Sequence, residues 1–145
     1  MTANAETQAI SQEYDLPFPP AKVWRALTEP ELLGQWLMAT DMQPVVGQSF
    51  TFRDKPMPWW DGIVRCEVLK IEPNMLVSYT WRSGPESSPL DTIVTWTLAP
   101  TASGGTRLTL EHSGFVPANE FAFEGAKKGW QEKVGRLAEV LAKAA

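Results

Sequence analysis

The chain has 145 residues, close to the commonest size of one domain and long enough to bury roughly two thirds of the surface that the unfolded chain exposes. Its 13 basic and 17 acidic residues give a formal net charge of -4, and no basic run is longer than Lys127 and Lys128. Such a chain lacks the basic surface that nucleic acids and anionic membranes attract. We therefore expect a single domain over residues 1–145, with residues 1–8 frayed, and no nucleic acid or membrane as a partner.

Metal and cofactor motifs are missing from the sequence. His112 and Cys66 are the only residues of their types, so one subunit cannot assemble a His/Cys zinc cluster, and the acidic residues lack calcium-loop spacing. No glycine-rich phosphate-binding motif occurs. We expect no metal and no cofactor. A lone cysteine, a first segment without the pattern of a signal peptide, and the lack of an apolar run of roughly 18 to 20 residues indicate a cytoplasmic protein.

The first third of the chain predicts one strand and two short helices. Residues 9–18 can form a strand, which Pro17 ends or places at a sheet edge. The segment PPAKVWRALTEPELLGQWL begins with two prolines that suit a first helical turn, and Pro30 breaks it in two. Thr28 and Glu31 have capping-box spacing for the second helix. Helices this short are stable only when packed on a larger element.

From residue 49 the apolar pattern changes to a period of two, which predicts strands separated by Pro, Gly, Asn and Ser clusters. The predicted strands are residues 49–54, 62–71, 76–82, 91–99 and 106–113. One parity is apolar and the other is mainly Thr, Ser, Arg, Glu and Asp, so we expect an antiparallel meander with one buried face. The apolar parity comprises Phe50, Phe52, Val64, Cys66, Val68, Val77, Tyr79, Trp81, Val94, Trp96, Leu98, Leu108, Leu110 and His112.

The last segment, residues 125–144, predicts a long amphipathic helix, because its apolar residues recur every three or four positions. These residues are Ala126, Trp130, Val134, Leu137 and Leu141. The apolar stripe of this helix and the apolar face of the sheet must both be buried, and packing against each other buries both. The simplest architecture is an α+β domain: one strand, two short helices, a curved antiparallel sheet that reaches about six strands in all, and the long helix across its concave face. Residues 38–47 are a connection or a lid over the mouth of a cavity, and we favour the connection.

Five sequence segments that resemble a known family follow one another from about residue 15 to the end of the chain. They are FPPAKVWRALTEPELLGQWL, GIVRCEVLKIEPNMLVSYTW, TWTLAP, GGTRLTLEHSGF and KKGWQEKVGRLAEVL. Their order and spacing resemble the activator of heat shock protein 90 ATPase homologue branch of the START and Bet v 1-like (SRPBCC) superfamily. The resemblance implies a helix-grip fold with a cavity between the long helix and the sheet, often used for small hydrophobic or lipid-like molecules. In that family, co-chaperone activity belongs to larger proteins with an additional N-terminal domain.

The inward parity is where such a ligand would lie. The chain has seven Trp and six Phe, and bulky rings around an incompletely filled grip are a usual lining of an apolar pocket. For each single ring, packing in the core is the alternative interpretation. The predicted ligand-binding residues are Trp36, Phe52, Trp60, Cys66, Tyr79, Trp81, Trp96, His112, Phe115, Trp130 and Val134.

Two adjacent tryptophans, Trp59 and Trp60, precede one of the predicted strands. Counting back in steps of two from Val64 through Gly62 places Trp60 on the inward side, at the rim of the cavity. Trp59 then falls on the opposite side, in an exposed patch or a subunit contact. The count assumes that no bulge interrupts the strand next to the glycine.

Catalysis has one candidate centre. His112 lies on the inward parity, where it is either held by hydrogen bonds as part of the core or acts on a ligand as donor, acid or base. Its neighbour Glu111 lies on the other parity and cannot form an acid–base pair with it. Cys66 reads as a small buried hydrophobe, since no basic residue accompanies it. His112, with or without Tyr79, is the candidate catalytic residue, and a pair of Cys66 with His112 is the remaining alternative.

Three functions follow from these patterns taken together with what the resemblance implies. The leading one is a non-enzymatic domain that holds a small hydrophobic, aromatic or lipid-like molecule. The first alternative is a cyclase- or hydrolase-like enzyme that uses His112 in the same cavity. The second is a protein interaction module of the Hsp90-activator-homologue type. A homodimer is compatible with each of them, because exposed apolar residues of the proline-rich loop could contribute to a subunit contact.

Overall fold

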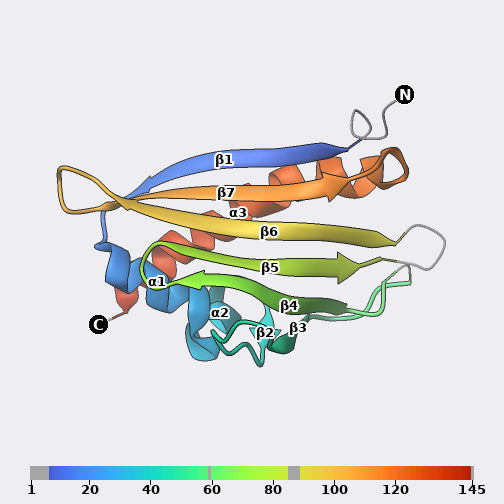
Figure 1. Ribbon diagram of the computed structural model, residues 1–145, viewed down its shortest axis with the longest axis horizontal. Coiled ribbons are helices and arrows are strands. Elements are labelled where there is room, and N and C mark those ends of the chain that lie inside the picture. The colour runs from blue at the N-terminus through green and yellow to red at the C-terminus, as the bar shows by residue number, and fades with distance from the viewer. Residues whose placement is uncertain (1–6, 59, 85–88, 145) are drawn as a thin grey trace.

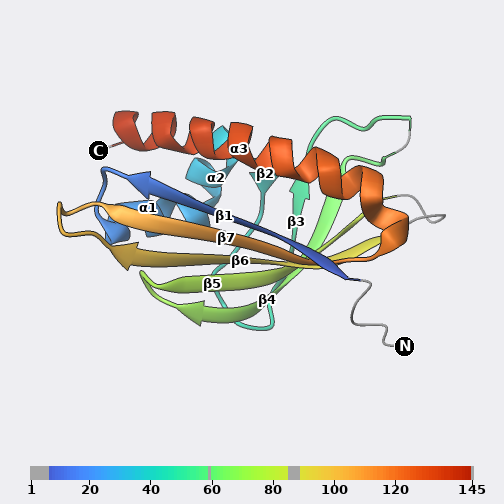
Figure 2. The ribbon, with the colours of Figure 1, turned by 90° about the horizontal axis from the view of Figure 1, so that it is seen from above.

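The computed structural model describes residues 7–58, 60–84 and 89–144. A seven-stranded antiparallel sheet has the spatial order β1-β7-β6-β5-β4-β3-β2, and one long helix, α3, lies along one of its faces (Figures 1 and 2). The strands are β1 (Gln8–Leu16), β2 (Ala39–Thr40), β3 (Ser49–Arg53), β4 (Ile63–Glu72), β5 (Leu76–Ser83), β6 (Leu90–Pro100) and β7 (Thr106–Phe115). The helices are α1 (Pro20–Thr28), α2 (Pro30–Trp36) and α3 (Glu120–Lys143), with a 3-10 turn, η2 (Pro117–Asn119), before α3.

The predicted helix-grip architecture is confirmed. Antiparallel ladders join successive strands from β2 to β7, and β1 closes the row by pairing with β7. The helices α1 and α2 lie near the C-terminal end of α3, on the same side of the sheet (Figure 2). The strand β2, only two residues long, falls in the predicted connection at residues 38–47 and brings the sheet to seven strands rather than about six.

The prediction that Thr28 caps the second helix is wrong. Thr28 is the last residue of α1, and its Oγ1 donates a hydrogen bond to the carbonyl of Trp24 at 2.8 Å. The N-cap of α2 is Glu29, which provides no side-chain cap. Pro30 is the first residue of α2, and its missing N–H is one of the four that the first turn of a helix leaves unpaired.

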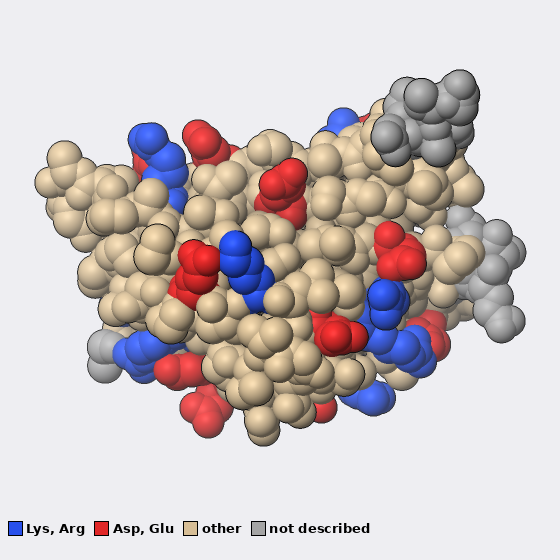
Figure 3. Space-filling view, in the orientation of Figure 1, with Lys and Arg blue, Asp and Glu red and all other residues tan. Residues whose placement is uncertain are grey.

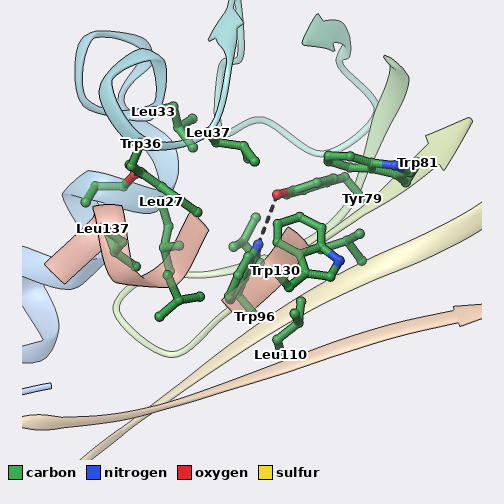
Figure 4. Packing of buried hydrophobic residues seen from close by; sticks show 14 of the residues in the cluster. Leu27, Leu33, Trp36, Leu37, Tyr79, Trp81, Trp96, Leu110, Trp130 and Leu137 are labelled. Atoms are coloured by element: carbon green, nitrogen blue, oxygen red, sulfur yellow. Dashed lines mark hydrogen bonds between the residues drawn. The ribbon is translucent and has the colours of Figure 1, made fainter. Parts of the chain in front are cut away.

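The two-residue period of the strands is also confirmed, because every residue of the predicted inward parity is buried. The predicted stripe of α3 faces this surface: Trp130, Val134, Leu137 and Leu141 are buried, and Ala126 is half-buried. Figure 4 shows rings from β5, β6 and α3 converging with leucines of α1, α2 and α3. One continuous core therefore joins the three helices and every strand except the two-residue β2.

The helix α3 begins at Glu120, five residues before the start predicted from the apolar stripe. Its first turn contains Phe121, which is 91% exposed and so breaks the amphipathic pattern that the prediction used. The buried Asn119 fixes this start: its Oδ1 accepts the N–H of Val116 at 3.2 Å, and its Nδ2 donates to the carbonyl of Pro89 at 3.1 Å. The amide thus ties the beginning of α3 to the chain just before β6.

The outer face of the sheet carries both signs of charge, interspersed rather than grouped (Figure 3). Its ion pairs include Arg65 with Asp61 at 3.2 Å, Arg82 with Asp91 at 3.0 Å and Arg107 with Asp15 at 3.1 Å. Exposed pairs of this kind contribute little to stability. In the described parts of the chain, no helix is both long enough and apolar enough to cross a membrane.

Candidate functional site

A cavity of about 160 Å³ lies between α3 and the inner face of the sheet. Its floor consists of the buried side chains of Leu37, Trp81, His112 and Trp130. Its rim consists of half-buried residues, and these are Met38, Leu90, Ala126, Gly129 and Lys133. The lining therefore comes from the end of α2, three strands and the middle of α3.

Three rings form the aromatic part of the floor. The ring centroids of Trp81 and Trp130 are 5.3 Å apart, those of Trp81 and His112 are 5.8 Å apart, and those of His112 and Trp130 are 5.9 Å apart. These separations and the tilted or edge-to-face planes are those that aromatic pairs prefer. Figure 4 shows Trp81 and Trp130 reaching one region of the core from β5 and from α3.

Both ring nitrogens of His112 are engaged. Trp130 Nε1–H donates to His112 Nδ1 at 3.0 Å, and His112 Nε2 lies 2.8 Å from Thr92 Oγ1. Thr92 uses its single hydroxyl hydrogen to donate to the carbonyl of Trp81 at 2.8 Å. Its oxygen must therefore accept from His112, which fixes the neutral tautomer with hydrogen on Nε2.

Burial lowers the pKa of His112 from 6.5 to about 3. A second proton would have to go onto Nδ1, where it would face the indole N–H of Trp130. His112 is thus held neutral, with no lone pair free for a substrate. Burial likewise raises the pKa of the Tyr79 hydroxyl and of the Cys66 thiol, so neither group ionises readily as a base or nucleophile.

The cavity exists because one flank of α3 has small residues above the rings. Ala126 and Gly129 face the floor with one methyl group and no side chain, respectively. The next large residue on this flank is Lys133, whose Nζ donates to the carbonyl of Leu37 at 3.1 Å. Its ammonium therefore connects α3 to the end of α2 at the rim of the cavity, and burial lowers its pKa.

The structure brings three of the predicted ligand-binding residues to the cavity, namely Trp81, His112 and Trp130. Six others are buried in the surrounding core, and these are Trp36, Phe52, Tyr79, Trp96, Phe115 and Val134. Within this group, Trp36 Nε1–H donates to the carbonyl of Ala26 at 2.8 Å, and Trp96 Nε1–H donates to Tyr79 Oη at 3.0 Å. Their polar atoms are thus used inside the core. Cys66 of β4 is buried opposite Phe50 of β3, and both residues line the second hollow described below rather than this cavity.

Trp60 does not continue the strand from which its position was predicted. Strand β4 begins at Ile63, and Gly62 before it has a φ of 81°. Trp60 instead pairs with Met57 through two backbone hydrogen bonds, and its Nε1–H donates to the carbonyl of Ile63 at 3.2 Å. The ring is half-buried against the core but does not line the cavity described above. Trp59, predicted to lie on the opposite side, is outside the described residues.

Several residues of the site were absent from the prediction. The cavity adds Leu37, Met38, Leu90, Ala126, Gly129 and Lys133, and His112 adds its partner Thr92. Thr92 carried a usable signal, because it shares the inward parity of Val94 and Trp96 and is buried with them. Ala126 and Gly129 of α3 carried no such signal, because the pattern of apolar residues does not show where a missing side chain leaves a cavity.

A second hollow, of about 380 Å³, is lined by residues of β3, β4 and β5 and by Asp41. Its charged lining residues are Asp41, Arg65, Glu67 and Arg82, which balance in sign. None of the aromatic residues predicted to bind a ligand lines it. Over the described ranges, no cluster of three or more His, Cys, Asp or Glu residues is arranged to hold a metal ion.

Comparison with known proteins identifies the family. The model of the activator of Hsp90 ATPase homolog 1-like protein family matches residues 17–142. The chain belongs to this family. The family resemblance inferred from the five sequence segments is thereby confirmed. A search among curated proteins found no match.

Solved structures agree with this assignment. The protein MLL2253 from Mesorhizobium loti is 39% identical, with a TM-score of 0.88 over 95% of this chain and 99% of that one. DynU16, a protein of the dynemicin biosynthetic locus, is 27% identical, with a TM-score of 0.75 over 93% of this chain and 47% of that one. The Aha1 dimer from Colwellia psychrerythraea shares the fold at 23% identity, with a TM-score of 0.75 over 92% and 96% of the two chains. At the level of the family, these likenesses support a ligand-binding domain.

Proposed function

We propose that this family member is a non-enzymatic cytoplasmic domain that binds a small hydrophobic molecule in the cavity between α3 and the sheet. The observation that carries the proposal is the floor formed by Trp81, His112 and Trp130, whose rings lie together beneath space that the protein leaves unfilled. Apolar lining with aromatic side chains is typical of small-molecule sites.

The geometry favours binding over acid–base catalysis. A general base needs a free lone pair and a pKa near the working pH. His112 has neither, because Trp130 and Thr92 occupy its two nitrogens and burial lowers its pKa to about 3. The phenol of Tyr79, the other catalytic candidate, lies in the core against Trp96. The role that fits His112 is to hold the rings of the floor in place.

A ligand screen with a cavity-filling variant tests the binding function. Native mass spectrometry and thermal shift should identify apolar compounds that bind the wild-type protein, since a ligand at 100 times its Kd stabilises the fold by about 2.7 kcal/mol. Ala126→Leu places a larger side chain in the cavity and should remove this stabilisation. Ala142→Leu, at an exposed position of the same helix, should retain it. The proposed site would be contradicted if no compound in a panel of aliphatic and aromatic molecules stabilised the wild-type protein. It would also be contradicted if a compound stabilised the Ala126→Leu and Ala142→Leu variants equally.

We also propose that the chain forms a homodimer. One solved protein of the same fold is an Aha1 dimer, and here Phe121 of α3 is 91% exposed. Exposed apolar side chains of this size commonly mark a contact surface when they belong to a larger patch, and Val116, also exposed, precedes the same helix. Sedimentation velocity over a range of concentrations should show a dimer that Phe121→Ser weakens. A monomer at every concentration would reject the proposal.

A further inference from the structure

Gly129 has no packing reason to be a glycine. A methyl group built on its Cα would meet no heavy atom within 4 Å, and glycine is the least favourable residue for a helix interior after proline. Gly129 is nevertheless one of the residues that line the cavity. The missing side chain therefore leaves space on the ligand side of α3.

Two other glycines of α3 provide the comparison. A methyl group at Gly125 or at Gly135 would also meet no heavy atom within 4 Å. Both residues are exposed, however, and neither lines the cavity. The space at Gly129 is thus distinguished by its place above the floor, between Ala126 and Lys133 along one flank of the helix.

We propose that Gly129 sets the size limit of the ligand, and that the buried part of this ligand is a single uncharged aromatic ring. The inference rests on the binding function proposed above. The size follows from the volume: an apolar cavity of about 150 Å³ holds one benzene molecule, and the cavity here is about 160 Å³. The shape follows from the floor, because two indole rings and an imidazole that already pack together offer a further ring the offset or edge-to-face contacts that aromatic pairs prefer.

The uncharged character follows from the partners of the lining groups. The nitrogens of His112 and the indole N–H of Trp130 are already hydrogen-bonded. The ammonium group of Lys133 belongs to the half-buried rim, where one of its three hydrogens is donated to the Leu37 carbonyl. The exception is the indole N–H of Trp81, for which the described residues provide no acceptor. Below the rim, this single indole N–H is all that the described lining offers to a charged group. A carboxylate would lose most of its hydration for one hydrogen bond and an ammonium group would gain no acceptor, so both are unfavourable.

The test is a titration of the protein with defined probe molecules. Binding is monitored through the NMR signals of the indole N–H groups of Trp81 and Trp130. The wild-type protein should bind benzene and toluene, and should bind naphthalene, benzoate and benzylammonium at least about tenfold more weakly. Gly129→Ala should lower the affinity for toluene by at least about tenfold, the scale on which one misplaced methyl group is discriminated in an apolar pocket. Gly135→Ala gains the same helix propensity and should leave every affinity unchanged.

A second variant tests the limit in the opposite direction. Leu90→Ala removes part of the rim and should raise the affinity for naphthalene at least about tenfold, a gain that misfolding cannot produce. If Gly129→Ala binds toluene as well as wild type, or if naphthalene already binds wild type as tightly as benzene, the size limit is overturned while the binding function survives. The same holds if wild type binds only aliphatic probes. If no apolar probe perturbs Trp81 or Trp130, the proposed function fails as well.

Discussion

At the scale of single residues, the neutral state of His112 makes stability depend on pH. Its folded pKa of about 3 is below the ordinary value of 6.5, so the unfolded chain takes up a proton first as the pH falls. The resulting stabilisation is complete above pH 6.5 and is lost as the pH decreases toward 3. We expect this histidine to lower the free energy of unfolding by about 1.2 kcal/mol between pH 6 and 5, measured by urea denaturation.

The control uses the fact that His112 is the only histidine of the chain. His112→Gln should be less stable overall, since it disturbs the bonds to Trp130 and Thr92, but its stability should not follow the same slope in this range. NMR should show that the imidazole of the folded wild type does not titrate near pH 6.5. An imidazole that does titrate there, or a flat stability profile for wild type, would refute the assignment.

At the scale of elements, the entry to β4 depends on Gly62. This residue has a φ of 81°, and its carbonyl accepts the N–H of Asp54 at 2.8 Å. A methyl group there would overlap the carbonyl oxygen of Asp54. Gly104, in the turn between β6 and β7, has a similar φ of 88° but open space around it. We expect Gly104→Ala to cost about 1 to 2 kcal/mol for the left-handed backbone, and Gly62→Ala to cost about 2 to 5 kcal/mol, with overpacking added.

Chemical denaturation of the two variants separates the cost of backbone strain from the cost of overpacking. Both variants carry a left-handed alanine, but only the methyl group at position 62 overlaps a neighbouring atom. Equal losses of stability would mean that the contact with Asp54 relaxes without cost. In addition, Gly62→Ala should shift the NMR signal of the Trp60 indole, because that N–H donates to Ile63 directly after the glycine. The Gly104 variant should leave this signal unchanged.

The same glycine shows what the sequence could predict and where prediction stopped. Alternation predicted the buried face of β3 to β7 because it depends on the period of a strand, and each such residue is buried. Trp60 lay beyond Gly62, where the left-handed backbone ends the alternation, so counting could not place it. The cavity was harder still: Trp81, His112 and Trp130 were in the predicted set, but whether rings fill a core or enclose space depends on their packing. That packing is decided by Ala126 and Gly129, which carry no apolar signal.

At the scale of the whole molecule, α3 and the sheet are halves of one core and should unfold together. Leu137 of α3 is fully buried among residues of that core, and Figure 4 shows it near Leu27 of α1. Leu137→Ala should lower the free energy of unfolding by about 2 to 5 kcal/mol. Circular dichroism of the helices and tryptophan fluorescence of the core should still give coincident transitions with an unchanged denaturant slope, because neither layer keeps a core without the other.

Phe121→Ala, at a residue of the same helix that is 91% exposed, should change the stability of the monomer by less than about 0.5 kcal/mol. Separate transitions for the two probes in wild type would show that α3 can leave the sheet, and the cavity would then open by helix release rather than at its rim.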